Sequence, residues 1–441
     1  MILLINTKTT KPSEVQTEYF REPNLGILYL AAILDKNNFP VDILDLEQFY
    51  DLDNEGLEDL ILNRVRNYDV IGITTLTNTF YSAIKIAKLI KEYDSQKFLI
   101  LGGPHVSFQY EEIIQQYPFI DFICIGEAEN SFLELITNII TFGPYPIHKS
   151  EIDKKLAKIK GLAFKDTDGT IIFTGFPKPV EIEKIPLPAR YLLPQENYYY
   201  RIANVIINRG CPNQCSFCSR QNLFRNVRIR NLESIKNEIL DIISFQTYHY
   251  INFYDNININ KHFFEQFCRM FIENHITIPW GCELRVDSIA PEHAKLLKEA
   301  GCRLVASGIE SASLEVLKQN LKFQHPDKVR DGIKHLKKVG IPVQLYFILG
   351  LPGETQITVQ QTLEFIKSLP LTKYDTINYF AATPYPGSLL WEEKERYQIK
   401  INEMNFSKYD CQHIIFETKD LDFKTLKELY SFAKEIEDFF N

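Results

Sequence analysis

The feature that most constrains the fold is a repeated alternation of short apolar runs with longer amphipathic stretches. In the first third of the chain, the apolar runs lie at residues 1–6, 41–46, 70–75, 98–101 and 122–125. Short apolar runs separated by helix-like stretches are typical of strands buried on both faces of a parallel sheet. We therefore predict an α/β protein in which residues 1–141 form a Rossmann-like, doubly wound sheet that binds a ligand at its carboxyl edge.

The alternation stops near residue 142 and returns near residue 201. Residues 142–200 are rich in proline, and Asp166-Thr167-Asp168-Gly169 predicts a hairpin turn. We interpret this stretch as an interdomain connector. Six further candidate strands follow, at residues 203–208, 250–254, 277–282, 303–307, 343–349 and 376–380. Six β/α units predict a partial (β/α)6 TIM-like barrel over residues 201–395, followed by a helical extension over residues 396–441.

Composition limits the kinds of function. The 441 residues are 45% hydrophobic and 24% charged, as in globular domains, which argues against a long disordered tail. A formal net charge of −8 argues against nucleic-acid binding and favours small-molecule ligands. No apolar run approaches the roughly 18 residues of a membrane span, and the first residues have no signal-peptide pattern. We expect a cytoplasmic protein without a membrane span.

Three of the eight cysteines stand apart from the rest. Five are scattered among apolar neighbours, where buried reduced thiols are expected: Cys124, Cys268, Cys282, Cys302 and Cys411. The other three, Cys211, Cys215 and Cys218, follow the first candidate strand of the barrel with CxxxCxxC spacing. Three thiolates from one tight loop can hold three irons of a cubane cluster and leave the fourth iron open for chemistry. A structural zinc site is the alternative, but it needs a fourth ligand, and the nearest downstream histidine is His249.

With this loop the chain resembles the radical SAM enzymes, and most closely their branch with an N-terminal cobalamin-binding domain. The resemblance covers nearly the whole chain. The matching segments after the cysteine loop lie at residues 227–230, 253–256, 280–285, 301–311, 350–355 and 384–387, in the order that this branch has.

The resemblance implies a 4Fe-4S cluster held by Cys211, Cys215 and Cys218. Its free iron would be chelated by S-adenosylmethionine (SAM), which is cleaved to a 5′-deoxyadenosyl radical after an external donor such as flavodoxin or ferredoxin supplies an electron. Phe217 would line the adenine site. The candidates for the polar groups of SAM are Asp255, Asn256, Arg285 and Glu310. The alternative for these side chains is ordinary capping of the barrel turns.

The first domain resembles the cobalamin-binding sheet of this branch, and small or hydroxylated residues at its strand ends suit the nucleotide tail of cobalamin. The candidate contacts are Thr74, Thr75, Leu76, Gly102, Gly103, Pro104, His105, Gly126 and Glu127. One departure is that no histidine precedes His105, so the loop at residues 7–23 cannot offer cobalt an axial imidazole. For His105, a structural role is as well supported as a place beside the cofactor.

The resemblance implies a cobalamin-dependent radical SAM enzyme, most simply a methyltransferase acting on an unactivated centre of a small metabolite or natural-product intermediate. The alternative is oxidation, cyclisation or ring rearrangement without methyl transfer. A regulatory protein that has lost catalysis is disfavoured by the intact cysteine loop. A tRNA methylthiotransferase is disfavoured because only Cys124 precedes Cys211, which leaves no ligands for a second cluster.

Overall fold

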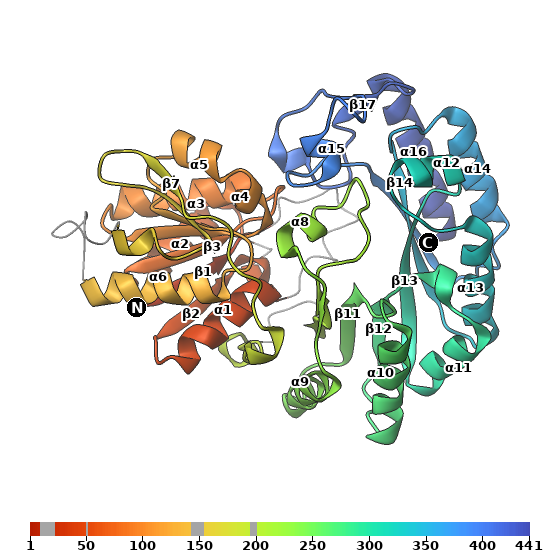
Figure 1. Ribbon diagram of the computed structural model, residues 1–441, viewed down its shortest axis with the longest axis horizontal. Helices are drawn as coiled ribbons and strands as arrows, with labels where there is room; N and C mark the ends of the chain where they lie inside the picture. Colours follow the sequence, from red (N-terminus) through yellow and green to blue (C-terminus); the bar gives the residue numbers. More distant parts are fainter. Residues whose placement is uncertain (9–22, 50–51, 143–153, 195–200) are drawn as a thin grey trace. The chain divides into compact units, whose positions relative to one another are not determined.

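The computed structural model describes residues 1–8, 23–49, 52–142, 154–194 and 201–441. Two compact units divide the chain: residues 1–200 with 223–225, and residues 201–222 with 226–441 (Figure 1). Each unit has its own helices and its own sheet, which is mostly parallel in the first unit and fully parallel in the second, so the predicted α/β class is confirmed. No helix among the described residues is both long enough and apolar enough to span a membrane.

The first unit is built on a seven-stranded sheet with the order β2-β1-β3-β4-β5-β6-β7. Its five parallel strands have the 2-1-3-4-5 order of flavodoxin-like sheets, as expected for a Rossmann-like domain. They are β1 (Ile2–Asn6), β2 (Val41–Asp45), β3 (Val70–Thr74), β4 (Phe98–Gly102) and β5 (Phe122–Cys124). The helices are α1 (Leu25–Lys36), α2 (Asn54–Val65), α3 (Phe80–Tyr93), α4 (Pro104–Phe108), α5 (Tyr110–Gln116) and α6 (Glu129–Phe142).

The proline-rich stretch adds a hairpin to this sheet. Strands β6 (Leu162–Lys165) and β7 (Ile171–Phe173) pair antiparallel with each other, and β6 pairs antiparallel with β5. Gly169 makes the turn between them with φ of +81°, a left-handed conformation that glycine adopts without strain. The predicted hairpin at residues 166–169 is thus present, and it extends the first sheet.

The second unit contains the six-stranded parallel sheet that the sequence predicts for a partial barrel. In spatial order its strands are β8 (Ile202–Val205), β11 (Tyr250–Asn256), β12 (Trp280–Glu283), β13 (Cys302–Glu310), β14 (Val343–Leu349) and β15 (Thr376–Ala381). Its main helices are α9 (Leu232–Ser244), α10 (Lys261–Glu273), α11 (Pro291–Glu299), α12 (Leu314–Gln319), α13 (Pro326–Lys338), α14 (Gln356–Lys367) and α16 (Phe423–Phe440). Shorter elements are α8 (Arg220–Phe224), α15 (Leu389–Glu392), β9 (Asn208–Arg209), β10 (Arg228–Ile229), β16 (Ile399–Ile401) and β17 (Phe416–Thr418).

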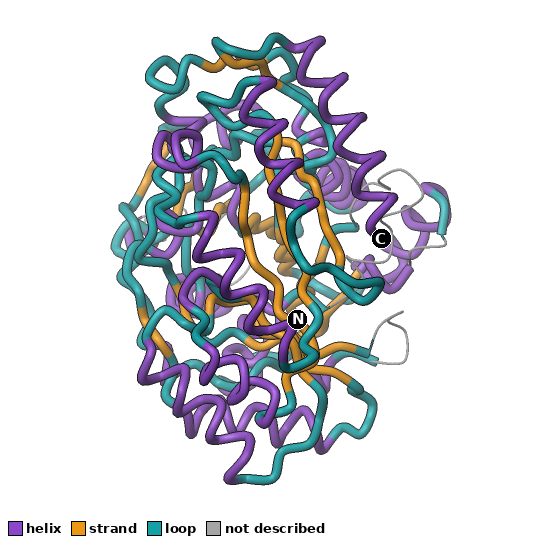
Figure 2. Tube along the Cα trace, turned by 90° about the vertical axis from the view of Figure 1, so that its right-hand side faces the viewer, coloured by secondary structure: helices purple, strands orange, loops and turns teal. Residues whose placement is uncertain are grey.

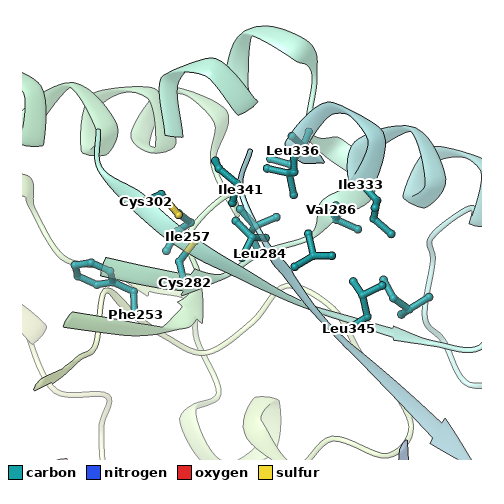
Figure 3. Packing of buried hydrophobic residues seen from close by; sticks show 14 of the residues in the cluster. Phe253, Ile257, Cys282, Leu284, Val286, Cys302, Ile333, Leu336, Ile341 and Leu345 are labelled. Atoms are coloured by element: carbon teal, nitrogen blue, oxygen red, sulfur yellow. The ribbon is translucent and has the colours of Figure 1, made fainter. Parts of the chain in front are cut away.

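Alternation along the strands separates a packed face from an open one. In β14, every second residue is buried, and these residues join the core that the sheet shares with the helices. Figure 3 shows part of this core, to which β14 contributes Leu345 and α13 contributes Ile333. The strands run inside a shell of helices (Figure 2). Residues of the other parity, such as Gln344 and Tyr346, are only partly buried on the face away from the helices.

Candidate functional site

The three cysteines lie in the loop that leaves β8 at the carboxyl edge of the sheet. Before them, β9 pairs antiparallel with β10, and Gly210 has φ of +83° where a Cβ atom would lie 2.4 Å from the carbonyl oxygen of Asn226. Only glycine therefore fits directly before Cys211. The amide of Cys218 donates to the carbonyl of Cys215 at 3.0 Å, which makes a tight turn. Cys218 is exposed, and the other two thiols are partly buried.

Within the described residues, no three His, Cys, Asp or Glu side chains converge on one metal ion. A cubane cluster has a different requirement, because each thiolate binds its own iron. The donor set fits such a cluster: three soft sulfur ligands stand on one loop, and the Nδ2 amide of Asn213 donates to Cys211 Sγ at 3.5 Å. An N–H donor directed at sulfur stabilises the thiolate form that binds iron.

Asp255, at the end of β11, anchors the start of the cysteine loop. Its carboxylate accepts hydrogen bonds from the amides of Ile207 at 2.7 Å and Asn208 at 3.0 Å, and it pairs with the Arg220 guanidinium just after Cys218. The residue is 1% exposed. The structure therefore gives Asp255 a positioning role on the loop, and its expected contact with SAM stays a prediction.

Asn320 anchors the middle of the loop. Its Oδ1 accepts from the hydroxyl of Ser216 at 2.7 Å, and its Nδ2 donates to the carbonyl of Pro352 at 2.9 Å. Both Ser216 and Asn320 are fully buried. The turn containing Pro352 is closed by Glu354, whose carboxylate accepts from the Gly350 amide at 2.6 Å. Burial raises the pKa of Glu354 to about 8. The hydrogen bonds from backbone amides favour the ionised carboxylate and partly oppose this rise.

Glu310, at the end of β13, occupies a strained backbone position. Its φ is +63°, which is unusual for a residue other than glycine, and its Oε1 lies 2.8 Å from Lys322 Nζ. A Cβ atom on Gly308 would come within 2.3 Å of that carboxylate oxygen. Gly308 therefore leaves the space in which the Glu310 carboxylate folds back toward Lys322. A residue with a strained backbone persists only where the surrounding structure holds it in place. Such residues concentrate at functional sites.

Asn256 and Arg285 meet at the next strand end. Asn256 Oδ1 accepts from the Arg285 amide at 3.3 Å, while the Arg285 guanidinium pairs with Asp287 at 3.2 and 2.8 Å. Phe217 is partly buried and packs against an apolar cluster that includes Leu351. The structure thus places Asn256, Arg285 and Phe217 around the carboxyl edge of the sheet and the cysteine loop. Their contacts with SAM stay predictions.

Glu283, Lys322, Asn213 and Asn320 are site residues that were not among the candidates from the sequence. Glu283 ends β12, between the neighbouring ends of β11 and β13. Burial, followed by the negative charge of Asp255, raises the pKa of Glu283 to about 7. Its place within the motif at residues 280–285 was the available signal.

In the first unit, the candidate cobalamin contacts gather at the carboxyl ends of β3, β4 and β5. The Thr75 hydroxyl donates to the Gly102 carbonyl at 2.9 Å. Gly103 has φ of +106°, and a Cβ atom there would lie 2.3 Å from the Thr75 carbonyl oxygen. Ser107 joins the turns, since its hydroxyl donates to the Gly103 carbonyl at 2.8 Å and accepts from the Gly126 amide at 2.9 Å. A Cβ atom on Gly102 would meet nothing within 4 Å, so the space directly beside this glycine is open.

The remaining first-unit candidates differ in their surroundings. Thr74 ends β3 partly buried, and Leu76 is 42% exposed at the same edge. Pro104 begins α4, and Glu127 accepts from the Val180 amide at 3.4 Å. The loop at residues 7–23, where an axial histidine is absent, falls mostly outside the described residues.

His105 is a buried residue of α4. Its Nδ1 lies 3.3 Å from the hydroxyl of Thr77, and its ring packs on Phe80 with centroids 4.4 Å apart. Burial lowers the pKa of His105 to about 3, so the ring is neutral at physiological pH. These contacts account for a structural role, and the expected place of His105 beside cobalamin stays a prediction.

Two family models match the chain: the radical SAM superfamily over residues 205–366 and the B12 binding domain over residues 15–136. An uncharacterized methyltransferase of Pyrococcus horikoshii is 31% identical over 428 residues, which cover 92% of this chain and 86% of the relative. The chain therefore belongs to the radical SAM superfamily, in the branch that carries a cobalamin-binding domain. Its cofactors are a 4Fe-4S cluster, SAM and cobalamin.

Two further proteins are similar to this chain. An anaerobic magnesium-protoporphyrin IX monomethyl ester cyclase of Rubrivivax gelatinosus is 27% identical over 401 residues, which cover 88% of this chain and 68% of the cyclase. The solved structure of TsrM, a radical S-adenosylmethionine methyltransferase from Kitasatospora setae, has a TM-score of 0.70 and 16% identity and covers 92% of this chain and 77% of TsrM. The likeness to TsrM confirms the expected fold.

We expect substitution of Cys211, Cys215 and Cys218 by alanine to abolish the cluster, because no other thiols stand on this loop. Anaerobically reconstituted wild-type protein should hold four irons and four sulfides per chain. The triple variant should hold almost none and should not cleave SAM. Replacing the buried thiol Cys124 by serine is the control. A triple variant that keeps four irons would contradict the ligand assignment.

We expect Glu283→Gln to stabilise the protein at pH 8.5 and to stabilise it clearly less at pH 5.5. The folded-state pKa is raised from 4.5 to about 7, so the bound proton contributes its full stability only below pH 4.5, and this contribution is lost progressively as pH rises from there through 7. Thermal unfolding followed by circular dichroism at both pH values measures the difference. Glu273→Gln, on an exposed part of α10, is the control. Equal Tm shifts at the two pH values would contradict this assignment.

We expect cobalamin bound to this chain to lack an axial imidazole from the protein. No histidine lies in residues 1–104, and His105 is buried against Thr77 and Phe80. Electron paramagnetic resonance of the cob(II)alamin form, with protein labelled by 15N-histidine, tests this directly. A superhyperfine splitting from 15N would show that a histidine binds cobalt.

Proposed function

We propose that this cobalamin-dependent radical SAM enzyme is a methyltransferase acting on an unactivated carbon or phosphorus centre of a small molecule. The observation that carries the proposal is the similarity to the Pyrococcus horikoshii methyltransferase across both units, 92% of this chain. The histidine-free first 104 residues support it, because a weak axial donor favours homolytic release of a methyl group from cobalt. The similarity to the cyclase supports the alternative function, which is ring formation without methyl transfer.

When bound, the cluster supplies the electron that cleaves SAM, and cobalamin supplies the methyl group. The protein's part is to position these groups. Cys211, Cys215 and Cys218 hold the cluster, and the buried anchors Asp255 and Asn320 fix the loop from which they project. A rigid loop holds the open iron position at a constant place relative to the strand ends.

Glu310 and Lys322 match the methionine end of SAM, which offers one amino group and one carboxylate. Both side chains are largely buried, and their charged atoms are 2.8 Å apart. Burial opposes the charge on Lys322, but the neighbouring Glu310 carboxylate leaves the pKa of Lys322 raised, so the lysine stays charged. We assign Glu310 to the amino group of SAM, from whose N–H it would accept a hydrogen bond, and Lys322 to the carboxylate of SAM.

The substrate we propose is an uncharged molecule with a planar or apolar part. The open face of the sheet carries amides and aromatic rings: Gln344 Nε2 donates to Asn378 Oδ1 at 3.0 Å, and the rings of Tyr346 and Phe380 lie 5.6 Å apart. These side chains alternate with residues that face the helices. Amides orient polar groups without needing a charged partner, while the rings offer apolar area.

We also propose that a flavodoxin or ferredoxin supplies the electron, because the reaction needs a one-electron donor of low potential. The cytoplasm, which is reducing and contains such donors, is the proposed location. The free thiols are consistent with that compartment, and none of the eight cysteines forms a disulfide.

Anaerobic turnover with methyl-labelled SAM tests methyl transfer. A methyltransferase of this kind uses one SAM as the methyl source and another as the radical source. With the true substrate, S-adenosylhomocysteine and 5′-deoxyadenosine should therefore form in near-equal amounts, and the product should gain one labelled methyl group. Product and 5′-deoxyadenosine without S-adenosylhomocysteine would reject methyl transfer and favour the cyclase-type alternative. The triple cysteine variant is the control for background methylation.

A further inference from the structure

The side chain of Asn213 lies between a cluster cysteine and a fixed arginine. Asn213 stands two residues after Cys211, and its Nδ2 lies 3.5 Å from Cys211 Sγ. Its Oδ1 accepts from Arg285 Nη1 at 3.3 Å. Because a guanidinium can only donate, it must face the amide oxygen, and this turns the NH2 group of Asn213 toward the sulfur.

Arg285 is itself held from several sides. Its Nε and Nη2 donate to the two carboxylate oxygens of Asp287 at 3.2 and 2.8 Å, and Nη2 also donates to the carbonyl of Phe323. Its backbone amide is bound by Asn258 Oδ1 at 2.9 Å. Together with the hydrogen bond to Asn213, these contacts use four of the five N–H donors of the guanidinium. The group therefore has little freedom to turn.

We propose that Asn213, oriented by Arg285, is a positioning residue that raises the reduction potential of the cluster through an N–H···S hydrogen bond to Cys211. This inference rests on the proposed role of Cys211 as a cluster ligand. Reduction adds one electron, from the external donor, to a cluster whose sulfur ligands then carry more negative charge. A hydrogen bond to one of those sulfurs is stronger in the reduced state and so favours reduction.

Arg285 therefore also influences the potential of the cluster. Asp287 orients the Arg285 guanidinium, the guanidinium orients the side-chain amide of Asn213, and this amide donates to Cys211 Sγ. Without Arg285, the side-chain amide of Asn213 would be free to turn its oxygen toward Cys211. An amide oxygen has no hydrogen to donate and cannot stabilise a thiolate. Arg285→Gln should therefore shift the potential in the same direction as removal of the amide donor.

The test is a redox titration of the reconstituted full chain, followed by electron paramagnetic resonance of the reduced cluster. Asn213→Ala and Asn213→Asp should both lower the midpoint potential relative to wild type. The aspartate keeps the shape and the contact with Arg285 but removes the donor, so it serves if the alanine variant assembles its cluster poorly. Asn222→Ala is the matched control, because the Asn222 amide donates to the Gly387 carbonyl at 2.8 Å instead of to a cysteine. This control should leave the potential unchanged.

A second readout is independent of the potential. In protein labelled with 15N-asparagine, pulsed electron paramagnetic resonance of the reduced wild-type cluster should detect a coupled 15N nucleus, and Asn213→Asp should remove it. An unchanged potential and an unchanged 15N coupling in Asn213→Asp, with four irons retained, would overturn the proposal. Cys211→Ala separates the two levels of inference: if it keeps an intact cluster, the ligand assignment itself is wrong.

Discussion

The buried carboxylate of Asp255 is the interaction on which the geometry of the second unit's site depends. The chain leaves β8 and turns into a loop whose first amides have lost their strand partner. A carboxylate from the adjacent strand accepts the amides of Ile207 and Asn208, and its charge is balanced by Arg220 beyond the last cysteine. The start and the end of the loop are thus tied to one point. Removing Arg220 would leave the buried Asp255 carboxylate without its countercharge, which is strongly destabilising, whereas Arg220 is 31% exposed and can be partly solvated.

A second point of attachment makes the loop rigid between its ends. Ser216 and Asn320 are separated by 104 residues in sequence, yet their side chains are 2.7 Å apart and fully buried. Asn320 also donates to the Pro352 carbonyl. Its side-chain amide therefore holds both the cysteine loop and the glycine-rich turn after β14. Motifs that are far apart in sequence are therefore mechanically linked. This link explains why a loop without regular secondary structure can present three sulfur ligands in a fixed arrangement.

The sequence alone predicts the two sheets and the cluster loop, but not the contacts between distant segments. The apolar runs at residues 343–349 and 376–380 coincide with β14 and β15 to within a residue, because strand periodicity depends on local composition. The spacing of the cysteines and the order of the motifs can also be read directly from the sequence. The spacing identifies the cluster loop, and the motif order identifies the cobalamin-binding branch of the radical SAM enzymes. In contrast, the contact between Ser216 and Asn320 joins residues 104 positions apart, and no local pattern indicates it. The hairpin turn of β6 and β7 is likewise predictable, whereas its pairing with β5 is not.

The distribution of thiols determines which cysteines are open to oxidation. Cys124, Cys268, Cys282 and Cys302 are buried, and burial raises the pKa of Cys124 to about 12 and those of Cys268 and Cys282 well above the ordinary value. Burial raises the pKa of Cys215 and of Cys218 on the cluster loop as well, so accessibility is what distinguishes this loop: Cys218 is exposed, and oxidants reach it first. The four interior thiols are shielded by burial. We therefore expect that material whose cluster was lost by reversible oxidation of the loop thiols can be restored by reduction with iron and sulfide, without unfolding the chain.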